Sequence, residues 1–379
     1  MLADVVLIAG EASGDAQAAL LARAMRGIRP DLQFAGAGGD AMRAAGVQVL
    51  FDTTELAAIG PISVLLRLPK IYAAYLRMDS LLRSDPPGLL VPIDSGSVNL
   101  RLLARLRRRG YDGDIVYYFP PAAWLDYADT ARRTAALAAP LTPFAHQRDF
   151  YRSLSLPIEY FGHPMVSAIV ARSPRAVGDP ICVAILPGSR REEVRYHLPV
   201  LARAAAALRS GRRAQFRIVA ASNERARQID EGWPQFGGPP EASIERRPAV
   251  EVLADADLSW TASGTAVLEA ALVGVPQVAF YVVSPAQYRI AQRRIPAIVS
   301  GFITLPNLVL GRELVLELKQ HDFAEERLLE RSRSLLDDER ERRAQVEGYA
   351  ELRSALGPPD ALERIAAFMV ERLEHRSVR

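Results

Sequence analysis

The sequence has one cysteine, Cys182, and two lysines among its 379 residues. A single cysteine can form neither an intramolecular disulfide nor a multi-cysteine metal site. Cys182 lies in an apolar run at residues 181–186, where a small buried side chain in a strand is expected instead of a reactive thiol. The five histidines show no metal-ligand spacing with one another, so we predict no metal site.

Charge of one sign and long apolar runs are also lacking. The formal net charge is +3, from 47 basic and 44 acidic residues, and no basic patch is interleaved with aromatic side chains, which argues against a nucleic-acid partner. No apolar stretch approaches the roughly 20 residues of a membrane-spanning helix. The chain begins directly with a strand pattern instead of a signal peptide, so we expect a cytoplasmic protein.

What the sequence does have is an alternation of strand and helix patterns in both halves. Its length exceeds the roughly 250–300 residues at which a single core stops growing. The main strand patterns lie at residues 4–9, 32–35, 89–93, 115–118, 157–162, 181–186, 216–220, 258–260 and 277–282. Such alternation predicts parallel sheets covered by helices on both faces. We predict an α/β protein of two doubly wound, Rossmann-like domains that face each other across a ligand-binding cleft.

A stretch containing proline and glycine, at residues 173–180, marks the predicted boundary between these domains. Residues 1–170 form the predicted first domain and residues 171–345 the second. The charged carboxyl-terminal part, residues 346–379, is predicted to be helical and to pack back on the first domain or on a partner subunit.

The loop at residues 186–190 is a candidate phosphate site, because it joins a buried strand to a helix. Gly188 permits close approach of the backbone, and Ser189 can cap the helix while free N–H groups face an anion. Arg190 adds a planar guanidinium suited to a diphosphate. The alternative is an ordinary capped helix start.

A second strand-to-helix junction and a later loop extend this candidate site. Ser263 and Thr265, on either side of Gly264, can donate hydrogen bonds to phosphate oxygens. The carboxylate of Glu269, one turn inside the helix, can accept from both hydroxyls of a ribose. Asn307, in the apolar loop 304–308, is either a local turn former or a site residue.

Taken in order, these motifs resemble those of the lipid-A-disaccharide synthase family. The second half contains PGSR, SGTAxLE and LPNLxxGRELVxEL at residues 187–190, 263–269 and 305–318. The first half contains GEASGD, GAGG, ELA and FGHPM at residues 10–15, 36–39, 55–57 and 161–165. The resemblance therefore extends over nearly the whole chain, and the motifs are specific as a set.

The resemblance implies a GT-B fold, with the donor on the second domain and the acceptor on the first. The implied reaction joins UDP-2,3-diacylglucosamine to 2,3-diacylglucosamine 1-phosphate with inversion, giving a β-1,6 disaccharide and UDP, without a metal or other cofactor. Donor binding is carried onto Arg190, Ser263, Gly264, Thr265, Glu269 and Asn307, beside Gly188 and Ser189. The resemblance places Glu11 and Asp15 opposite the donor and suggests a homodimer formed through the carboxyl-terminal region.

The sequence departs from the family on the acceptor side. In the motif that begins at Asp94, the family's second aspartate, a candidate base, is replaced by Ser97. A serine hydroxyl is a poor base near neutral pH, because it must first lose its own proton. Our candidate catalytic residues are Asp94, Glu11 and Asp15, with Asp126 as a further candidate base. The alternative role of Asp94 is a helix cap and that of Glu11 a turn carboxylate.

The family's SPSxWAWR motif is likewise replaced by residues 119–126, which keep only one proline and Trp124. The carboxylate expected after the ELA motif is also absent. Three hypotheses follow, in descending order of preference. The chain runs the family reaction with another base, transfers a UDP-sugar to a different acceptor, or binds nucleotide-sugar without turnover.

Residues 61–77 are apolar with interspersed cations, as in a helix that lies on a membrane surface. Leu65, Leu66, Leu68 and Tyr72 are the candidate acyl-contacting residues. The alternative is a core-packing helix with a basic exposed side. Because acylated substrates require contact with a bilayer, we expect peripheral association with the inner membrane.

Overall fold

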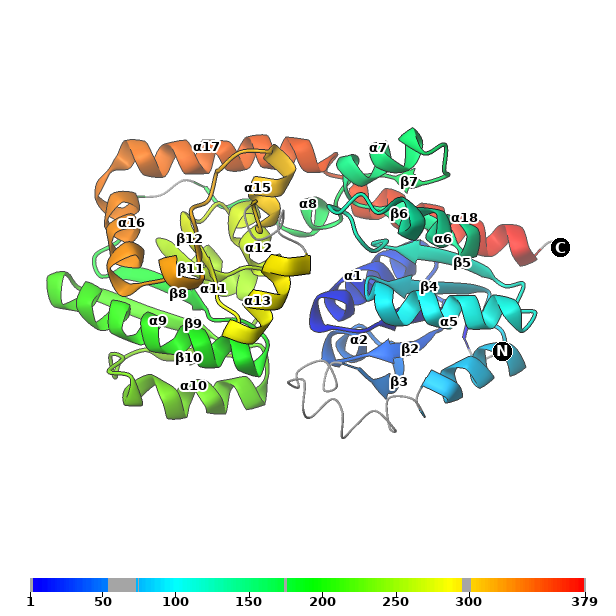
Figure 1. Cartoon of the computed structure of the whole chain (residues 1–379), viewed down its shortest axis with the longest axis horizontal. Coiled ribbons are helices and arrows are strands. Elements are labelled where there is room, and N and C mark those ends of the chain that lie inside the picture. The colour runs from blue at the N-terminus through cyan, green and yellow to red at the C-terminus, as the bar shows by residue number, and fades with distance from the viewer. Residues whose placement is uncertain (1–2, 54–72, 74, 174–175, 295–300, 378–379) are drawn as a thin grey trace. The chain divides into compact units, whose positions relative to one another are not determined.

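The computed structural model of the chain describes residues 3–53, 73, 75–173, 176–294 and 301–377 (Figure 1). Two compact units are present, Met1–Ala168 with Leu356–Arg379, and Ile169–Ala355. The candidate acyl-contacting residues Leu65, Leu66, Leu68 and Tyr72 lie outside the described residues.

The first unit contains a seven-stranded sheet in the order β3-β2-β1-β4-β5-β6-β7, in which every strand pair is parallel. Its strands are β1 (Val5–Ala9), β2 (Phe34–Gly38), β3 (Gln48–Asp52), β4 (Leu89–Ile93), β5 (Asp114–Tyr118), β6 (Ala139–Thr142) and β7 (Glu159–Tyr160). The chain winds away from the central pair β1 and β4 in both directions. The carboxyl ends of β1 and β4 therefore form a topological switch point, where such sheets bind ligands.

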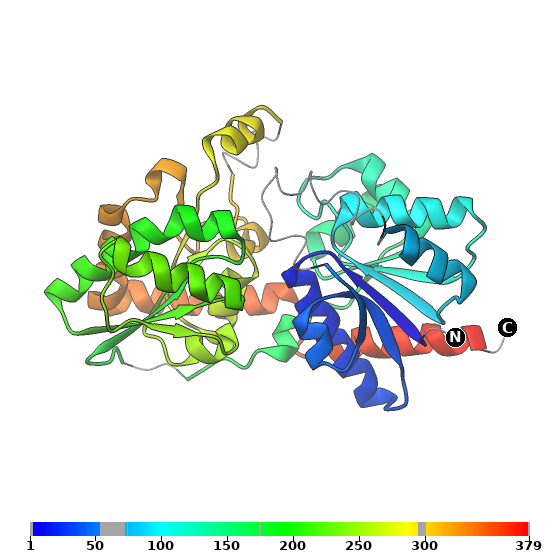
Figure 2. The ribbon, with the colours of Figure 1, turned by 90° about the horizontal axis from the view of Figure 1, so that it is seen from below.

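The helices of this unit are α1 (Ala12–Ile28), α2 (Asp40–Ala44), α5 (Gly96–Arg108), α6 (Ala128–Leu137), α7 (Ala145–Ser153), α8 (Met165–Ala168) and α18 (Ala361–Ser377), and residues 75–84 are also helical. Although α18 is last in the chain, it packs beside α1 (Figure 2). Ile365, Met369 and Leu373, spaced four apart on one face of α18, are buried in the core of the first sheet. Arg372 pairs with Asp114 of β5 through two hydrogen bonds of 2.8 and 2.6 Å.

The second unit contains a six-stranded parallel sheet in the order β10-β9-β8-β11-β12-β13. Its strands are β8 (Ile181–Leu186), β9 (Ala214–Val219), β10 (Ser243–Glu245), β11 (Leu258–Ala262), β12 (Gln277–Tyr281) and β13 (Glu317–Lys319). Its helices are α9 (Arg191–Gly211), α10 (Asn223–Gln235), α11 (Ala249–Ala254), α12 (Thr265–Val273), α13 (Pro285–Arg294), α15 (Leu305–Leu310), η1 (Gln320–Asp322), α16 (Glu325–Asp337) and α17 (Glu339–Leu356). The switch point of this sheet lies between β8 and β11.

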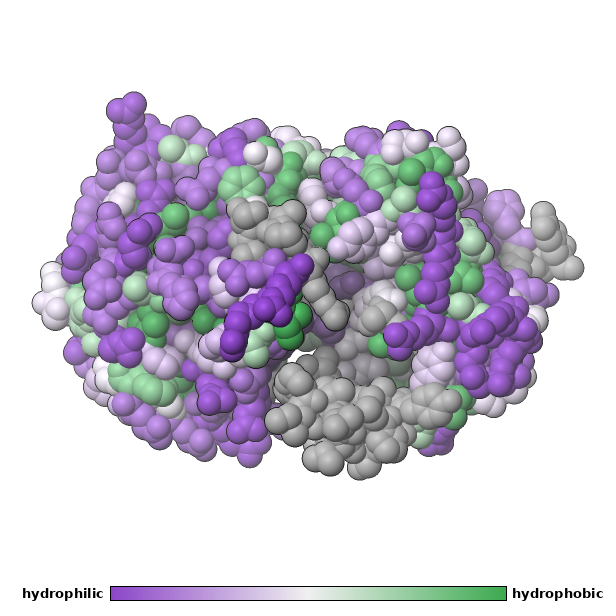
Figure 3. All heavy atoms as spheres, in the orientation of Figure 1, coloured by the Kyte–Doolittle hydropathy of each residue, from purple (hydrophilic) through white to green (hydrophobic). Residues whose placement is uncertain are grey.

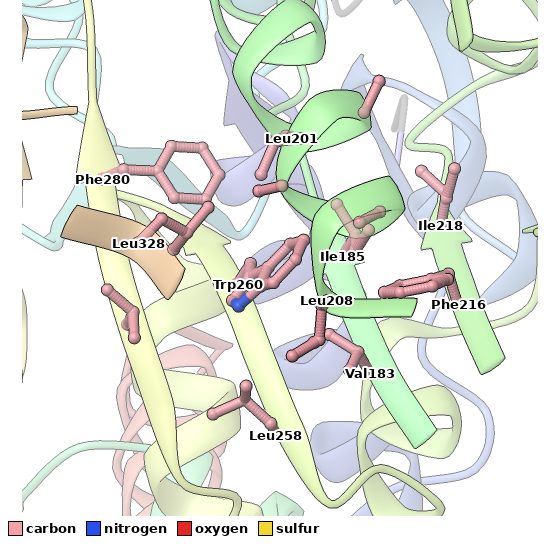
Figure 4. Close-up of a cluster of buried hydrophobic side chains, with 14 of the residues drawn as sticks. Val183, Ile185, Leu201, Leu208, Phe216, Ile218, Leu258, Trp260, Phe280 and Leu328 are labelled. Carbon is pink, nitrogen blue, oxygen red and sulfur yellow. The ribbon is translucent and has the colours of Figure 1, made fainter. Parts of the chain in front are cut away.

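The core of the second unit surrounds Trp260 of β11, whose side chain is fully buried (Figure 4). Leu201 of α9, Phe280 of β12 and Leu328 of α16 belong to the same cluster. The indole Nε1 donates a hydrogen bond of 2.8 Å to Ser332 Oγ, so the polar atom of this ring is not left unsatisfied. The core thus fixes β8, β11 and β12, the strands whose carboxyl ends carry the candidate donor loops.

Hydrophilic residues predominate on the surface shown in Figure 3, with apolar ones scattered among them. Of the helices that the structure describes, none combines the length and apolar character needed to cross a membrane.

Candidate functional site

The loops that follow β1 and β4 touch each other at the switch point of the first sheet. A Cβ added to Gly10 would lie 2.2 Å from Ser95 Oγ, so only glycine fits between the two loops. Glu11 is the N-cap residue of α1 and makes no capping hydrogen bond with its side chain. Asp94 directly follows β4 and is exposed. The structure therefore brings together the loops that carry two of the predicted catalytic residues, Glu11 and Asp94.

The turn that carries Asp94 is strained. Asp94 and Ser95 have φ angles of 48° and 47°, in the left-handed region that non-glycine residues rarely adopt. The buried side-chain amide of Asn99 donates to the carbonyls of Ile93 and Asp94, over 3.3 and 2.9 Å. Tyr117 adds a hydrogen bond of 2.7 Å from its hydroxyl to the Asp94 carbonyl, and burial raises the pKa of that hydroxyl. Strain of this kind persists where the surroundings enforce it, commonly at functional sites.

The loop after β5 carries three more non-glycine residues with positive φ, namely Phe119, Ala122 and Asp126, with angles of 55°, 63° and 46°. It packs against the turn after β4, because a Cβ on Gly96 would lie 2.4 Å from the Pro121 side chain. The strained backbone of the first unit is therefore concentrated at the carboxyl ends of two adjacent strands.

Asp15 occupies a different environment from the other two predicted catalytic residues. Its carboxylate is buried and accepts hydrogen bonds from the backbone N–H groups of Gly39, Ala41 and Met42, over 2.7, 2.9 and 3.2 Å. These groups belong to the first turn of α2 and the residue before it, so Asp15 acts as a cap for that helix. With both oxygens engaged, Asp15 is placed to hold α2 and not to accept a proton from a substrate.

A cavity of about 390 Å³ opens beside these loops. It is lined by Gly96, Leu100, Arg101, Pro121, Ala122, Thr130 and Arg133. The two arginines come from α5 and α6, and their planar guanidinium groups suit a phosphate.

Sequence reasoning missed His146, the second residue of α7, because it compared the histidines only with one another. The ring atom Nε2 of His146 lies 3.0 Å from Oδ1 of Asp126, in the loop after β5. Trp124 stacks on the imidazole, with ring centroids 5.2 Å apart and planes inclined by 14°. Two features of the sequence could have indicated this pair. Asp126 is an ionisable residue close to Trp124, and His146 lies at the start of α7.

In the second unit, the loop at residues 188–190 differs from expectation. The N–H groups of Ser189 and Arg190, predicted to be free for an anion, donate to Oε2 of Glu193 over 3.0 and 3.1 Å. The Arg190 side chain also pairs with Glu193, over 3.1 Å. Gly188 has a φ of 116°, and a Cβ there would lie 2.7 Å from the Glu193 side chain. The carboxylate of Glu193 thus occupies the start of this helix. Glu193 is the third residue after the N-cap residue Arg190, a position from which a side chain reaches the backbone N–H groups of the cap.

The start of α12 is open by comparison. Gly264, its N-cap residue, is exposed, and no atom of the described residues lies within 4 Å of the place where a Cβ would be. As a glycine, Gly264 supplies no capping side chain, and the first turn of this helix contains no acidic residue. Ser263 donates from its hydroxyl to the carbonyl of Ile303, over 3.2 Å, and Thr265 is the first helical residue. Because the N–H groups at a helix start favour anions, this junction is the more accessible of the two candidate phosphate sites.

Glu269 lies one turn further along α12 and is half-buried. Burial raises the pKa of its carboxyl group. Among the described residues, Glu269 has no hydrogen-bonding or ion-pairing partner. A partly desolvated carboxylate without a partner is energetically costly, and such groups are typical of functional sites.

Asn307 is fully buried, and both ends of its side chain are engaged. Its amide nitrogen donates to the Val315 carbonyl and to Glu317 Oε1, over 2.8 and 2.9 Å. Its oxygen accepts from the N–H groups of Leu314 and Val315, over 2.8 and 2.9 Å. This geometry gives Asn307 a positioning role in its loop, in place of the direct donor contact that we expected.

His197 of α9 joins the loops after β8 and β12. The Val282 N–H donates to its Nε2 over 3.0 Å, so the ring proton is on Nδ1, which donates to the Pro187 carbonyl over 2.7 Å. Burial lowers the pKa of this imidazole. His197 is therefore neutral and links Pro187 to Val282.

Comparison with known proteins decides the family. A model of the family described as lipid-A-disaccharide synthetase matches residues 5–364 of the chain. A lipid-A-disaccharide synthase of Geobacter metallireducens is 33% identical over 379 residues, which cover 97% of each protein. The chain belongs to the lipid-A-disaccharide synthase family. As a member of this family, it is a glycosyltransferase of lipid A biosynthesis, which confirms the resemblance seen in the sequence.

Solved structures confirm the predicted fold class of two doubly wound α/β units of the GT-B type. The UDP-GlcNAc 2-epimerase from Neisseria meningitidis superposes with a TM-score of 0.62 at 11% identity, covering 97% of this chain and 100% of the epimerase. The glycosyltransferase of kitacinnamycin gives a TM-score of 0.59 at 14% identity, covering 98% of this chain and 99% of that one. At such identities the likeness shows the fold alone.

Two of the departures from the family motifs that were noted in the sequence fall in described elements of the first unit. Ser97, where the family motif has an aspartate, is the second residue of α5. The loop after β5, where most of the family's SPSxWAWR motif is replaced, contains Asp126.

In the part of the chain that the structure describes, no three histidine, cysteine, aspartate or glutamate side chains are grouped so that they could hold a metal ion.

Proposed function

We propose that the chain joins UDP-2,3-diacylglucosamine to 2,3-diacylglucosamine 1-phosphate, releasing UDP and forming the β-1,6-linked disaccharide 1-phosphate. The second unit binds the donor and the first unit binds the acceptor. The observation that carries the proposal is the environment of Glu269, whose carboxylate is half-buried and without a partner among the described residues. A ribose offers two adjacent hydroxyls that a carboxylate accepts with both oxygens.

The open start of α12 supports the same assignment. With Glu269 on the ribose, the diphosphate of the donor lies at Gly264 and Thr265, where the N–H groups of the helix start favour negative charge. The positively charged guanidinium of Arg190 contributes to binding of this diphosphate. In this proposal Ser263 and Asn307 act indirectly, by fixing the loops around residues 303 and 315.

The cavity beside Arg101 and Arg133 is our proposed site for the phosphate of the acceptor. Changing both arginines to alanine is expected to raise the KM for the acceptor and leave UDP binding by the second unit unchanged. Arg108, also on α5 and exposed, supplies the matched control. An unchanged KM in the double variant would remove the cavity from the acceptor site.

The test of the function is incubation of the purified chain with UDP-diacylglucosamine and acylated glucosamine 1-phosphate, with detection of UDP and disaccharide by mass spectrometry. Formation of both products is expected. Failure to release UDP with any acylated sugar acceptor would contradict the proposal. The replacement of acceptor-side motifs around Ser97 and residues 119–126 favours one second candidate, a transfer to a different acceptor, which the same assay detects as UDP release with another product.

Contact with the membrane follows from the acylated substrates. We propose that the segment at residues 61–77 supplies this contact through Leu65, Leu66, Leu68 and Tyr72, and that the chain works as a peripheral protein of the inner membrane. Vesicle flotation of the wild type and of the Leu65→Ser, Leu66→Ser, Leu68→Ser triple variant tests it. Release of the variant without loss of stability is expected, whereas unchanged flotation with reduced stability would instead indicate a core-packing helix.

A homodimer through the carboxyl-terminal region is likewise a proposal, tested by sedimentation equilibrium.

A further inference from the structure

The pair His146 and Asp126 is a contact between two ionisable side chains outside the candidate donor loops. Both side chains are about half exposed, at 45% and 48% of their full accessible surface. They are therefore reachable by a substrate while remaining in hydrogen-bond contact over 3.0 Å. Asp126 comes from the loop after β5 and His146 from the start of α7, so the pair lies at the carboxyl end of the first sheet with Asp94 and Glu11.

The direction of this hydrogen bond determines the chemistry of the imidazole. An ionised carboxylate can only accept, so the proton of neutral His146 is on Nε2, which donates to Asp126 Oδ1. The other ring atom, Nδ1, is then unprotonated. Among the described residues, Nδ1 has no hydrogen-bond partner. An imidazole held in this way can take a proton on Nδ1, and the carboxylate stabilises the imidazolium that forms.

The position of the pair is fixed by its surroundings. The buried side chain of Gln147, next to His146, donates to the carbonyls of Pro120 and Pro121, over 3.1 Å each. The oxygen of the same side chain accepts from the Thr142 hydroxyl over 2.7 Å. Gln147 therefore ties the loop after β5 directly to α7. Asp126 itself has a left-handed φ of 46°, a conformation that persists only where the structure enforces it.

The other charged groups near His146 do not offer a competing partner. Asp149 is on the same helix and lies near His146. Its carboxylate is held by Arg148 through hydrogen bonds of 2.8 and 3.0 Å, which lower the pKa of Asp149. Trp124, which stacks on the imidazole, brings no charge. Asp126 is therefore the carboxylate that controls the imidazole.

We propose that His146 is the catalytic base of this chain and that Asp126 is its positioning residue, in place of a carboxylate at residue 97. This inference rests on the proposed function. In the step, the 6-hydroxyl of the acceptor gives its proton to Nδ1 of His146. The oxygen forms the new bond to C1 of the donor sugar, and the bond from C1 to the diphosphate breaks, so that its electron pair leaves with UDP. No other reactant is needed.

The experiment compares purified full-length wild type with His146→Gln, Asp126→Asn and His375→Gln. His375 is the matched control, because it is an exposed histidine of the same unit that also lies near a carboxylate, 3.5 Å from Glu371. Three properties are measured: disaccharide formation as a function of pH, UDP binding by calorimetry, and thermal unfolding.

In His146→Gln we expect kcat to fall about 100-fold or more, with UDP binding and unfolding temperature unchanged. The pH dependence of kcat/KM is expected to differ between this variant and the wild type, because the variant lacks the group that accepts the proton. Asp126→Asn is expected to lower kcat about 10-fold or more, since a neutral amide stabilises the imidazolium less. His375→Gln is expected to behave as wild type.

Full activity and an unchanged pH profile in His146→Gln would overturn the assignment while leaving the synthase activity intact. Wild-type chain that binds UDP but forms no disaccharide would overturn the assignment and the proposed function together. A loss of activity in His146→Gln that is matched by a loss of folded protein is resolved with His146→Asn. If the folded His146→Asn variant has wild-type kcat, the base lies elsewhere.

Discussion

The side-chain amide of Asn307 donates a hydrogen bond of 2.9 Å to the Glu317 carboxylate, and both groups are buried. The same oxygen of Glu317 accepts from the hydroxyl and the N–H of Thr304, over 2.8 and 2.9 Å, and Lys319 lies 3.6 Å from the other oxygen. Glu317 of β13 thus holds residues 303–307 in place through these hydrogen bonds. Asn307 therefore helps to hold this loop in place.

Asn307→Asp is expected to destabilise the chain, because it removes the donor and brings a second carboxylate to Glu317. A buried charge left without a partner costs about 3–5 kcal/mol. Urea unfolding measures the effect. Asn223→Asp, at the exposed start of α10, is the matched control and is expected to change stability by less than about 1 kcal/mol. Wild-type stability with lost UDP binding in Asn307→Asp would instead indicate direct contact with the donor.

Glu269→Gln is expected to weaken UDP binding and, at the same time, to stabilise the unliganded chain near neutral pH. The folded-state pKa of Glu269 is raised by burial, so at a pH above that value the charged carboxylate disfavours folding, and the neutral amide relieves this penalty. Calorimetry with UDP and thermal unfolding measure the two effects. Glu251→Gln, an exposed carboxylate in the first turn of α11, is expected to change neither. A fall in both stability and affinity would contradict the site role.

Arg190→Ala is expected to weaken UDP binding by about 1.5–3 kcal/mol, the contribution of a hydrogen bond to a charged group. Its effect on unfolding should be below about 1 kcal/mol, because the pair with Glu193 is about half exposed on the arginine side. Arg191→Ala, the exposed neighbour, is the comparison. Equal losses of UDP affinity in both variants would indicate a general effect of positive charge.

Asp15→Ala is expected to lower the free energy of unfolding by about 2–3 kcal/mol, since three N–H groups around the start of α2 lose a charged acceptor. Asp40→Ala serves as control, because Asp40 begins the same helix with a fully exposed side chain paired to Arg43. Urea unfolding separates the two variants. If Asp15→Ala keeps its stability and loses kcat, Asp15 belongs to the reacting groups after all.

His163 is expected to make the stability of the first unit sensitive to acid. Burial lowers its pKa to about 3, whereas the unfolded chain binds a proton near pH 6.5. Stability is therefore fully present above about pH 6.5 and falls by about 1.4 kcal/mol per pH unit below it, until the folded pKa is reached. Urea unfolding at pH 7.5 and 5.5 measures this slope. His163→Asn should flatten it and the exposed His375→Gln should not, so equal slopes in all three proteins would exclude His163 as the cause.

The sequence identified the strands at residues 89–93 and 181–186 with correct bounds, because buried parallel strands are continuous apolar runs between turn residues. It extended β7 too far, since residues 157–162 contain only the two-residue strand Glu159–Tyr160. It also missed β3, β6, β10 and β13. β10 and β13 have three residues each and β6 has four, and such short strands carry little periodic pattern and are stabilised by the neighbouring strand.

By itself, then, the sequence determined the α/β class, the family and the order of the donor motifs, because these depend on local patterns and on which residues are present. Only the tertiary structure decided what the polar side chains do. Folding forms three such contacts. Glu193 accepts from the N–H groups of Ser189 and Arg190, and Glu317 accepts from Asn307. Asp126 makes a hydrogen bond with His146, which is 20 residues away in the sequence. The hydrogen-bond donors around a carboxylate determine whether it caps a helix, holds a loop or remains available for a substrate. Those donors come from chain segments that only the packed sheet brings together.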